Sequence, residues 1–249
     1  MAFISRRNFA NFALSWDMEP QTYKIYFNEG ALIITDSLDA LKGIPNFYFI
    51  GDDEIHKSFN ILISSEALGK PMTFGLMTPE PQETLKEFIE EYTVIQAAGG
   101  LVFNKNNELL TIKRNGVWDL PKGKIERHED QIAAALREVM EETGINHLNI
   151  SEKIGETYHA YYEDNVILLK ETHWYRMNSS GTAPLKPQEE EGITEAKFAP
   201  LEWFESSEFQ SYNSIHDIIK KHLVVSERWS VFGGQPSAVR RQQRHRRNA

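Results

Sequence analysis

The chain has 249 residues, of which 41% are hydrophobic and 25% are charged, and its formal net charge is −9. This length favours two domains, and the composition is typical of globular proteins with a sizeable core rather than of disordered chains. The acidic balance argues against a protein built around nucleic-acid binding, and the absence of cysteine excludes disulfides, thiolate metal sites and a cysteine nucleophile.

The sequence shows no sign of a membrane span or of a secretory leader. No apolar stretch approaches the roughly 20 residues that an α-helix needs to cross a bilayer. The N-terminus also lacks the apolar core of a signal peptide. We therefore expect a protein that makes no membrane contact and works in the cytoplasm.

Residues 1–92 indicate an N-terminal α/β region of unknown role, because short apolar runs alternate there with turn residues. The first two runs flank a turn formed by Asn28, Glu29 and Gly30. We expect strands at 23–27, 31–35, 47–50 and 59–63, a short helix at 37–41 and a longer helix at 83–92. We recognise no motif with a chemical role in this region.

A second unit is expected from residue 93 to 225, where longer apolar segments follow one another. We expect strands at 94–103, 109–113, 154–162, 166–177 and 193–200, and helices at 130–143 and 214–224. Residues 226–249 form an Arg-rich tail, and its last 17 residues, from Gly233, carry five arginines and no acidic residue. Because glycine, proline and serine occur there without periodicity, we expect this tail to be disordered.

The segment 123–145, GKIERHEDQIAAALREVMEETGI, is the most informative part of the sequence. Asp130 is suited to the N-cap of a helix, and Gly144 to the position just after its C-terminus. Between them, apolar residues recur with the helical period and predict a buried stripe. The stripe comprises Ile132, Ala135, Leu136, Val139 and Thr143.

Three glutamates share another face of this helix. Glu138, Glu141 and Glu142 are spaced i, i+3, i+4, and such crowding of carboxylates is mildly destabilising on its own. A divalent cation reverses the repulsion, and hard oxygen ligands suit Mg²⁺, with Mn²⁺ as the alternative. The other interpretation is a solvated acidic face without a ligand.

This segment resembles the Nudix box, which reads Gly, five residues, Glu, seven residues, Arg-Glu, an aliphatic residue, any residue, Glu-Glu, any residue, Gly and an aliphatic residue. All nine defined positions match, and they are Gly123, Glu129, Arg137, Glu138, Val139, Glu141, Glu142, Gly144 and Ile145. The resemblance covers about 93–223 and implies the Nudix fold, a mixed α/β arrangement with a mixed sheet sandwiched between helices. It also implies an enzyme that hydrolyses a phosphate anhydride in a nucleoside diphosphate linked to another group.

The resemblance assigns roles to individual residues. The three glutamates of the shared face are expected to hold the metal, together with the backbone carbonyl of Lys122. Arg137 and Glu129 are expected to pair and to orient these ligands. In related enzymes the proton of the attacking water goes to a glutamate of the box, here Glu141 or Glu138, or to one on a later loop.

The loop before the strand expected at 193–200 contains three consecutive glutamates. Enzymes with this box often place an extra acidic ligand or base there, so Glu191 is a candidate catalytic residue and Glu190 is the second choice. The other interpretation is a solvated acidic loop.

The residues before the box indicate a phosphate-rich substrate. The Pro-Lys-Gly sequence that ends at Gly123 resembles Nudix enzymes acting on diadenosine polyphosphates and diphosphoinositol polyphosphates. Lys122 and Lys124 are candidates to contact extra phosphates, and the alternative is a pair of solvated lysines. Trp118 and Tyr158 are candidates to stack on a base, and the alternative is that these rings fill the core.

One position departs from related boxes. His128 stands where they usually have glycine, just before Glu129, so the loop is expected to differ in shape and to affect substrate choice. The metal ligands are not part of this loop.

Two functions follow from these observations. The first is a metal-dependent pyrophosphohydrolase, with a dinucleoside polyphosphate or related nucleotide as the preferred substrate. The second is a nucleotide-sensing or nucleic-acid-associated binding module that retains the Nudix fold, with the tail arginines contacting RNA phosphates. Intact Glu138, Glu141 and Glu142 favour the enzyme. Many Nudix enzymes are dimers, so the resemblance is also compatible with a homodimer.

Overall fold

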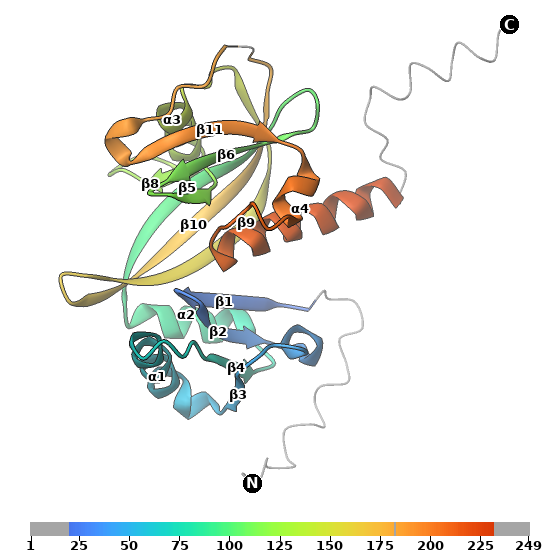
Figure 1. The fold of residues 1–249 in the computed structure, drawn as a ribbon. Coiled ribbons are helices and arrows are strands. Elements are labelled where there is room, and N and C mark those ends of the chain that lie inside the picture. Colours follow the sequence, from blue (N-terminus) through green and yellow to red (C-terminus); the bar gives the residue numbers. More distant parts are fainter. Residues whose placement is uncertain (1–19, 182, 232–249) are drawn as a thin grey trace, which may run out of the picture. The chain divides into compact units, whose positions relative to one another are not determined.

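The computed structural model describes residues 20–181 and 183–231, which form two units (Figure 1). The first unit contains the described residues up to Ile95 together with Tyr158–Glu171, and the second contains Gln96–Thr157 and the described residues from Thr172 onward. Three strands contribute to both units: β5, β9 and β10, at Thr93–Phe103, Leu148–Glu163 and Val166–Ser179. The domain boundary expected between residues 92 and 93 stays a prediction.

In the first unit, four strands lie beside the end of β9 in the order β9-β1-β2-β4-β3. β1 and β2 are antiparallel, and the turn between them includes Asn28. Its φ is positive, at 49°, and asparagine adopts this conformation more easily than most residues. β2 and β3 both run parallel to β4. β1 to β4 span Thr22–Phe27, Gly30–Thr35, Phe47–Ile50 and Thr73–Met77.

Helices α1 and α2 supply apolar residues that pack with this sheet into one core cluster. Phe59 of α1 and Phe88 of α2 are both buried and meet edge to face, with ring centroids 5.1 Å apart. The helices of this unit are α1 and α2, at Ile55–Ala67 and Pro81–Glu90, and two short 3₁₀ helices, η2 and η3, at Leu38–Leu41 and Asp52–Glu54.

The strand predicted at 59–63 is wrong, because these residues lie inside α1. A short apolar run does not by itself distinguish a buried strand from part of a helix. The buried residues Ile55, Phe59, Leu62 and Ile63 follow the helical i, i+4, i+7, i+8 pattern, which only becomes visible when Ile55 is included. The other strands predicted for this region are present.

The second unit contains a sheet between two helices. The strands follow the order β11-β6-β5-β10-β9, and β7 and β8 pair with β6 and β5. Successive residues of β5 alternate between two core clusters, since Val102 packs with α3 and its neighbours Leu101 and Phe103 pack with α4. The spans are Leu109–Arg114 for β6, Val117–Asp119 for β7, Lys122–Lys124 for β8, Ile193–Ala199 for β11, Gln131–Thr143 for α3 and Asn213–Val231 for α4, with 3₁₀ helices η4 at Glu189–Glu191 and η5 at Leu201–Glu205. The expected mixed α/β arrangement, with a mixed sheet between helices and an additional N-terminal α/β region, is present.

The caps of α3 are those that the sequence predicts. The Asp130 carboxylate accepts hydrogen bonds from the backbone N–H groups of Ile132 and Ala133, both at 2.9 Å. Gly144 adopts the left-handed conformation with φ 68°, which glycine reaches without strain. The helix that carries the glutamates therefore begins and ends where expected.

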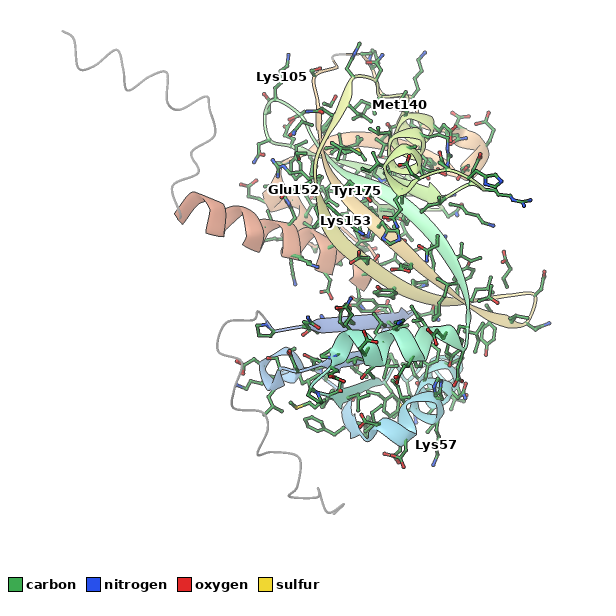
Figure 2. All side chains as sticks on the ribbon, turned by 180° about the vertical axis from the view of Figure 1, so that it is seen from behind. Lys57, Lys105, Met140, Glu152, Lys153 and Tyr175 are labelled. Atoms are coloured by element: carbon green, nitrogen blue, oxygen red, sulfur yellow. The ribbon has the colours of Figure 1, made fainter. Side chains whose placement is uncertain are left out.

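The buried face of α3 differs from the predicted stripe. Ile132 is wrong as a buried residue, since it is 49% exposed at the first turn, and Met140 lies on the outer surface of the helix (Figure 2). Glu138 and Glu142 are instead buried, at 7% and 0% exposure. The segment around β8 packs against α3 on the glutamate side, so the buried arc is rotated towards the carboxylates.

Helix α4 continues to Val231, beyond the end predicted at residue 224. The first helix breakers after that point are Gly233 and Gly234, so nothing in the intervening sequence stops the helix. The rest of the predicted disordered tail, 232–249, lies outside the described residues. In the described part of the chain, no helix is long and apolar enough to cross a membrane.

Candidate active site

Gly123 brings the strand before the box into direct contact with Glu138. β8 pairs with β5 through Ala98 and Gly123, which fixes the position of this segment. A Cβ atom placed on residue 123 would overlap the Glu138 carboxyl group. A larger residue here would displace the Glu138 carboxyl group, and glycine lets the chain lie directly against a carboxylate of the predicted metal site.

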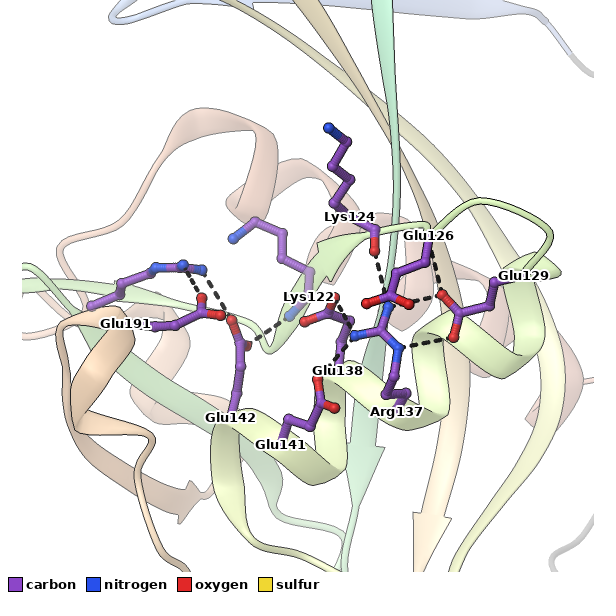
Figure 3. A network of polar contacts seen from close by, with 10 residues as sticks. Lys122, Lys124, Glu126, Glu129, Arg137, Glu138, Glu141, Glu142 and Glu191 are labelled. Atoms are coloured by element: carbon purple, nitrogen blue, oxygen red, sulfur yellow. Dashed lines mark hydrogen bonds and ion pairs between the residues drawn. The ribbon is translucent and has the colours of Figure 1, made fainter.

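Arg137 is the centre of a network of carboxylates (Figure 3). Its Nε and Nη2 atoms each donate to the carboxylate of Glu129 at 2.8 Å, which is a bidentate pair, and Nη2 also donates to the Lys124 carbonyl at 3.0 Å. Nη1 donates to Glu138 at 2.8 Å and to Glu141 at 2.9 Å. The hydrogen bonds from Arg137 lower the pKa of Glu129 to about 2. The expected pair of Arg137 with Glu129 is present. Nη1 of the same arginine brings two of the predicted ligands, Glu138 and Glu141, to one atom.

Glu142 is a fully buried carboxylate with both oxygens engaged. Its Oε1 accepts a hydrogen bond from Arg114 Nη1 at 2.9 Å, and its Oε2 accepts one from the Lys122 backbone N–H, also at 2.9 Å. Burial raises the pKa of Glu142 to about 7, although Lys122 and Arg114 act in the opposite direction. Burial also raises the pKa of Glu138. Burial therefore makes the charged form of both carboxylates less favourable.

Glu191 lies at the end of η4, and Arg114 brings it to the box helix. Nη2 of Arg114 donates to the Glu191 carboxylate while Nη1 holds Glu142. Backbone hydrogen bonds from Gln188 to the Glu142 carbonyl, at 3.1 Å, and from Asn115 to the Gly192 carbonyl, at 2.9 Å, fix the loop on either side. Glu190 is exposed. The structure thus brings Glu191 close to Glu142 of the box through a shared arginine, and its catalytic role stays a prediction.

The side chains present have the chemistry of a divalent cation site. Glu138, Glu141 and Glu142 offer hard oxygen donors, and two of the three are buried with raised pKa values. As they stand, these carboxylates are paired with Arg137 and Arg114, and within the described residues no three acidic or histidine side chains are already gathered around one point. The donor set fits a hard cation, which would take the place of some of these ion pairs.

The two candidate phosphate-binding lysines differ in their surroundings. The Lys122 ammonium lies 2.6 Å from the Asp119 carboxylate, and its side chain is only 17% exposed. Asp119 is itself buried and accepts the Leu120 backbone N–H at 2.8 Å. The Lys124 side chain is exposed, and within the described residues its ammonium makes no ion pair. Lys124 is the freer of the two for a ligand phosphate.

The two candidate stacking rings are both buried. Trp118 packs in the core beside α4, where it meets Trp203 edge to face at 5.1 Å and the Lys197 ammonium lies 4.4 Å from its ring centroid. Tyr158 belongs to the core of the first unit, where its hydroxyl donates to Glu171 at 3.1 Å. Their contact with substrate stays a prediction.

A comparison of the sequence with protein-family models decides the family. The model of the NUDIX domain matches residues 94–222, which is just over half of the chain. The chain belongs to the Nudix family. The matched segment contains α3, with its three glutamates, and the loop that carries Glu191.

Individual Nudix proteins share parts of this segment. A putative 8-oxo-dGTP diphosphatase from Bacillus subtilis is 39% identical over 71 residues, which are 28% of this chain and 47% of that protein. An RNA pyrophosphohydrolase from Roseobacter denitrificans is 38% identical over 63 residues, covering 24% of this chain and 39% of the relative. The match therefore spans less than half the length of these curated relatives.

Solved Nudix structures also align with the chain, at low similarity. A MutT protein from Methanosarcina mazei covers 53% of this chain and 94% of its own, with a TM-score of 0.42 and 23% identity. An Ap4A hydrolase from C. elegans covers 53% of this chain and 98% of its own, with a TM-score of 0.41 and 20% identity.

One position of the Nudix box departs from the usual sequence of related boxes. His128, which replaces the usual glycine, has a positive φ of 72°. The backbone is thus left-handed at the position where glycine adopts that conformation most easily. A conformation that suits glycine is thus occupied by histidine, and the expected effect of this residue on loop shape and substrate choice stays a prediction.

Sequence reasoning missed Arg114 and Asp119. Arg114 lies 28 positions from Glu142 and 77 from Glu191, so no local pattern reveals its role. Asp119 lies three residues before Lys122 within the Trp118–Gly123 loop signal, and this spacing of opposite charges was an available indication of the ion pair.

Proposed function

We propose that this chain is a magnesium-dependent hydrolase that cleaves a phosphate anhydride bond in a nucleoside diphosphate-linked substrate. The observation that carries the proposal is the arrangement on α3, where Glu138 and Glu141 converge on one nitrogen of Arg137 and Glu142 lies buried beside Arg114. A solvated acidic face would not bury two of its three carboxylates.

In this proposal the glutamates of α3 bind the metal and an arginine orients them. Glu138, Glu141 and Glu142 supply oxygen ligands, and Arg137, itself fixed by Glu129, orients the first two. A bound Mg²⁺, or Mn²⁺ in its place, neutralises charge on the phosphate oxygens and lowers the pKa of a water molecule.

Two glutamates are suited to accept the proton of the attacking water. The side chains of Glu141 and Glu191 are 49% and 39% exposed, so both reach solvent, whereas Glu142 does not. Proton transfer by a positioned side chain contributes about 100- to 10,000-fold to rate. Substitution of the true base by glutamine is therefore expected to lower kcat by at least about 100-fold.

We place dinucleoside polyphosphates first among the substrate classes. The Pro-Lys-Gly sequence before the box resembles enzymes that act on such compounds, and the exposed Lys124 is available to meet an additional phosphate. The names of the relatives add 8-oxo-dGTP and RNA as further candidates.

A substrate panel tests the proposal. The full chain is incubated with diadenosine tetraphosphate, ADP-ribose, 8-oxo-dGTP and 5′-triphosphorylated RNA, with Mg²⁺ or with EDTA, and products are identified by mass. We expect Mg²⁺-dependent turnover of at least one compound, and a loss of about 100-fold or more in Glu141→Gln. The matched control is Glu87→Gln on the exposed face of α2, which should retain wild-type activity.

The enzyme would be rejected by the absence of turnover on the whole panel although the folded protein binds one of the nucleotides, which would favour the binding-module alternative. Equal activity of Glu141→Gln and Glu87→Gln would instead reject the role proposed for Glu141 as a metal ligand or base. The predicted contact of the arginine tail with RNA concerns residues outside the described part of the chain and stays a prediction, as does a homodimer.

A further inference from the structure

Arg114 joins two carboxylates that come from distant parts of the chain. It is the last residue of β6, and its side chain is 30% exposed. Nη1 donates to Glu142 of α3 at 2.9 Å, and Nη2 donates to Glu191 of η4. One guanidinium therefore ties the late acidic loop to the box helix.

Glu142 is buried and needs compensating positive charge, which comes from Arg114 in direct contact and from the nearby Lys122. Its side chain has no exposed surface, and its other oxygen is occupied by the Lys122 backbone N–H. A buried carboxylate without a compensating charge is strongly destabilising. Among the described residues, Arg114 is the guanidinium that contacts it directly.

The two arginines of the site are anchored differently. Arg137 is fixed by the bidentate pair with Glu129 and by the Lys124 carbonyl, so it keeps these contacts when Glu138 and Glu141 turn to another cation. Within the described residues, the Arg114 guanidinium makes hydrogen bonds only to Glu142 and Glu191. A cation that takes these two carboxylates leaves Arg114 with neither partner.

We propose that Arg114 is an internal counter-ion of the metal site: it holds Glu142 and Glu191 together when no divalent cation is bound, and it is displaced from them when one binds. The proposal rests on the proposed function, because it requires these glutamates to hold a metal. Arg114 acts through the glutamates and is a positioning residue. It competes with the metal, so its removal should strengthen metal binding while releasing η4 from α3.

The test measures metal affinity without any substrate. The full chain is titrated with Mn²⁺, with the free ion followed by electron paramagnetic resonance, and with Mg²⁺ by calorimetry. The charged hydrogen bonds of Arg114 exist only in the metal-free state, so the substitution destabilises that state alone. Arg114→Gln should therefore bind Mn²⁺ about tenfold more tightly than the wild type. A residue with a purely structural role would not strengthen metal binding when removed.

The matched control is Lys113→Gln, one residue earlier on β6. It removes the same charge from the same strand, but Lys113 pairs with Glu195 at 3.1 Å and not with the box glutamates. We expect its Mn²⁺ affinity to stay within about twofold of the wild type, as for other exposed pairs. Hydrogen exchange should show faster exchange of the Glu191 and Gly192 amides in metal-free Arg114→Gln, and not in Lys113→Gln.

The outcomes separate the two proposals. Unchanged or weaker Mn²⁺ binding in Arg114→Gln overturns the counter-ion, whereas a wild-type chain that binds neither ion overturns the proposed function. If Arg114→Gln does not fold, the guanidinium resonance of Arg114 is followed in the wild type, assigned by comparison with Arg114→Lys. Mg²⁺ should convert that resonance to one of a freely rotating, solvent-exchanging group, and a resonance that stays protected overturns the inference.

Discussion

Replacing Gly123 by alanine tests how closely β8 must approach the predicted metal ligands. The added Cβ overlaps the Glu138 carboxyl group, which is 9% exposed and held by Arg137 at 2.8 Å, so the carboxylate has little room to move. Since a misplacement of about 1 Å at a catalytic centre costs about 100-fold in rate, we expect kcat/KM to fall by about this factor. Overpacking of this kind also lowers the free energy of unfolding by about 1–3 kcal/mol.

The assay is hydrolysis of the best substrate over a range of Mg²⁺ concentrations, with urea unfolding of the same samples. Gly51→Ala is the control, because its added Cβ meets the flexible Asp53 side chain at 3.1 Å, far from any box residue in sequence. If Gly123→Ala keeps the wild-type kcat/KM and Mg²⁺ dependence, glycine at this position is not needed to keep Glu138 in place.

Two further predictions concern stability. Phe59→Ala removes a fully buried ring that contacts Phe88 and should lower the free energy of unfolding by about 3–5 kcal/mol in urea titrations. The control is Ile61→Ala, at a position 42% exposed on the same helix, which should lower it by less than about 0.5 kcal/mol. Glu129→Gln tests the linkage to pH: the pKa of Glu129 is lowered from 4.5 to about 2, so its pair with Arg137 contributes stability that is fully present above pH 4.5 and is lost as the pH falls towards 2. The stability difference between wild type and Glu129→Gln should therefore shrink across that window, and a difference that stays constant would contradict the role of the pair.

The local structure of the box was predictable because its signals are local. The carboxylate of Asp130 reaches N–H groups two and three residues away, and Gly144 supplies a left-handed turn at its own position. Neither feature depends on the rest of the fold. The ends of α3 could therefore be read from the sequence.

Features that depend on longer patterns or on tertiary packing were not predictable in this way. The segment 59–63 looks like a strand until Ile55 is counted in the helical repeat. The burial of Glu142 follows from the packing of β8 on α3, which no periodicity in the helix encodes. Arg114 reaches the site only because β6 pairs with β11, whose preceding turn carries Glu191.

The burial of Glu142 distinguishes the acidic face of α3 from a solvated acidic face. Carboxylates in water need no partner, and their repulsion at i, i+4 spacing costs only a few tenths of a kcal/mol. A carboxylate with no exposed surface needs positive charge in direct contact, and here Arg114 supplies it. Two arginines face the five carboxylates of Glu129, Glu138, Glu141, Glu142 and Glu191, which leaves an excess of negative charge at one place. Such an excess is costly for a structural element, and under the proposed function a divalent cation next to a phosphate anhydride is the ligand that would relieve it.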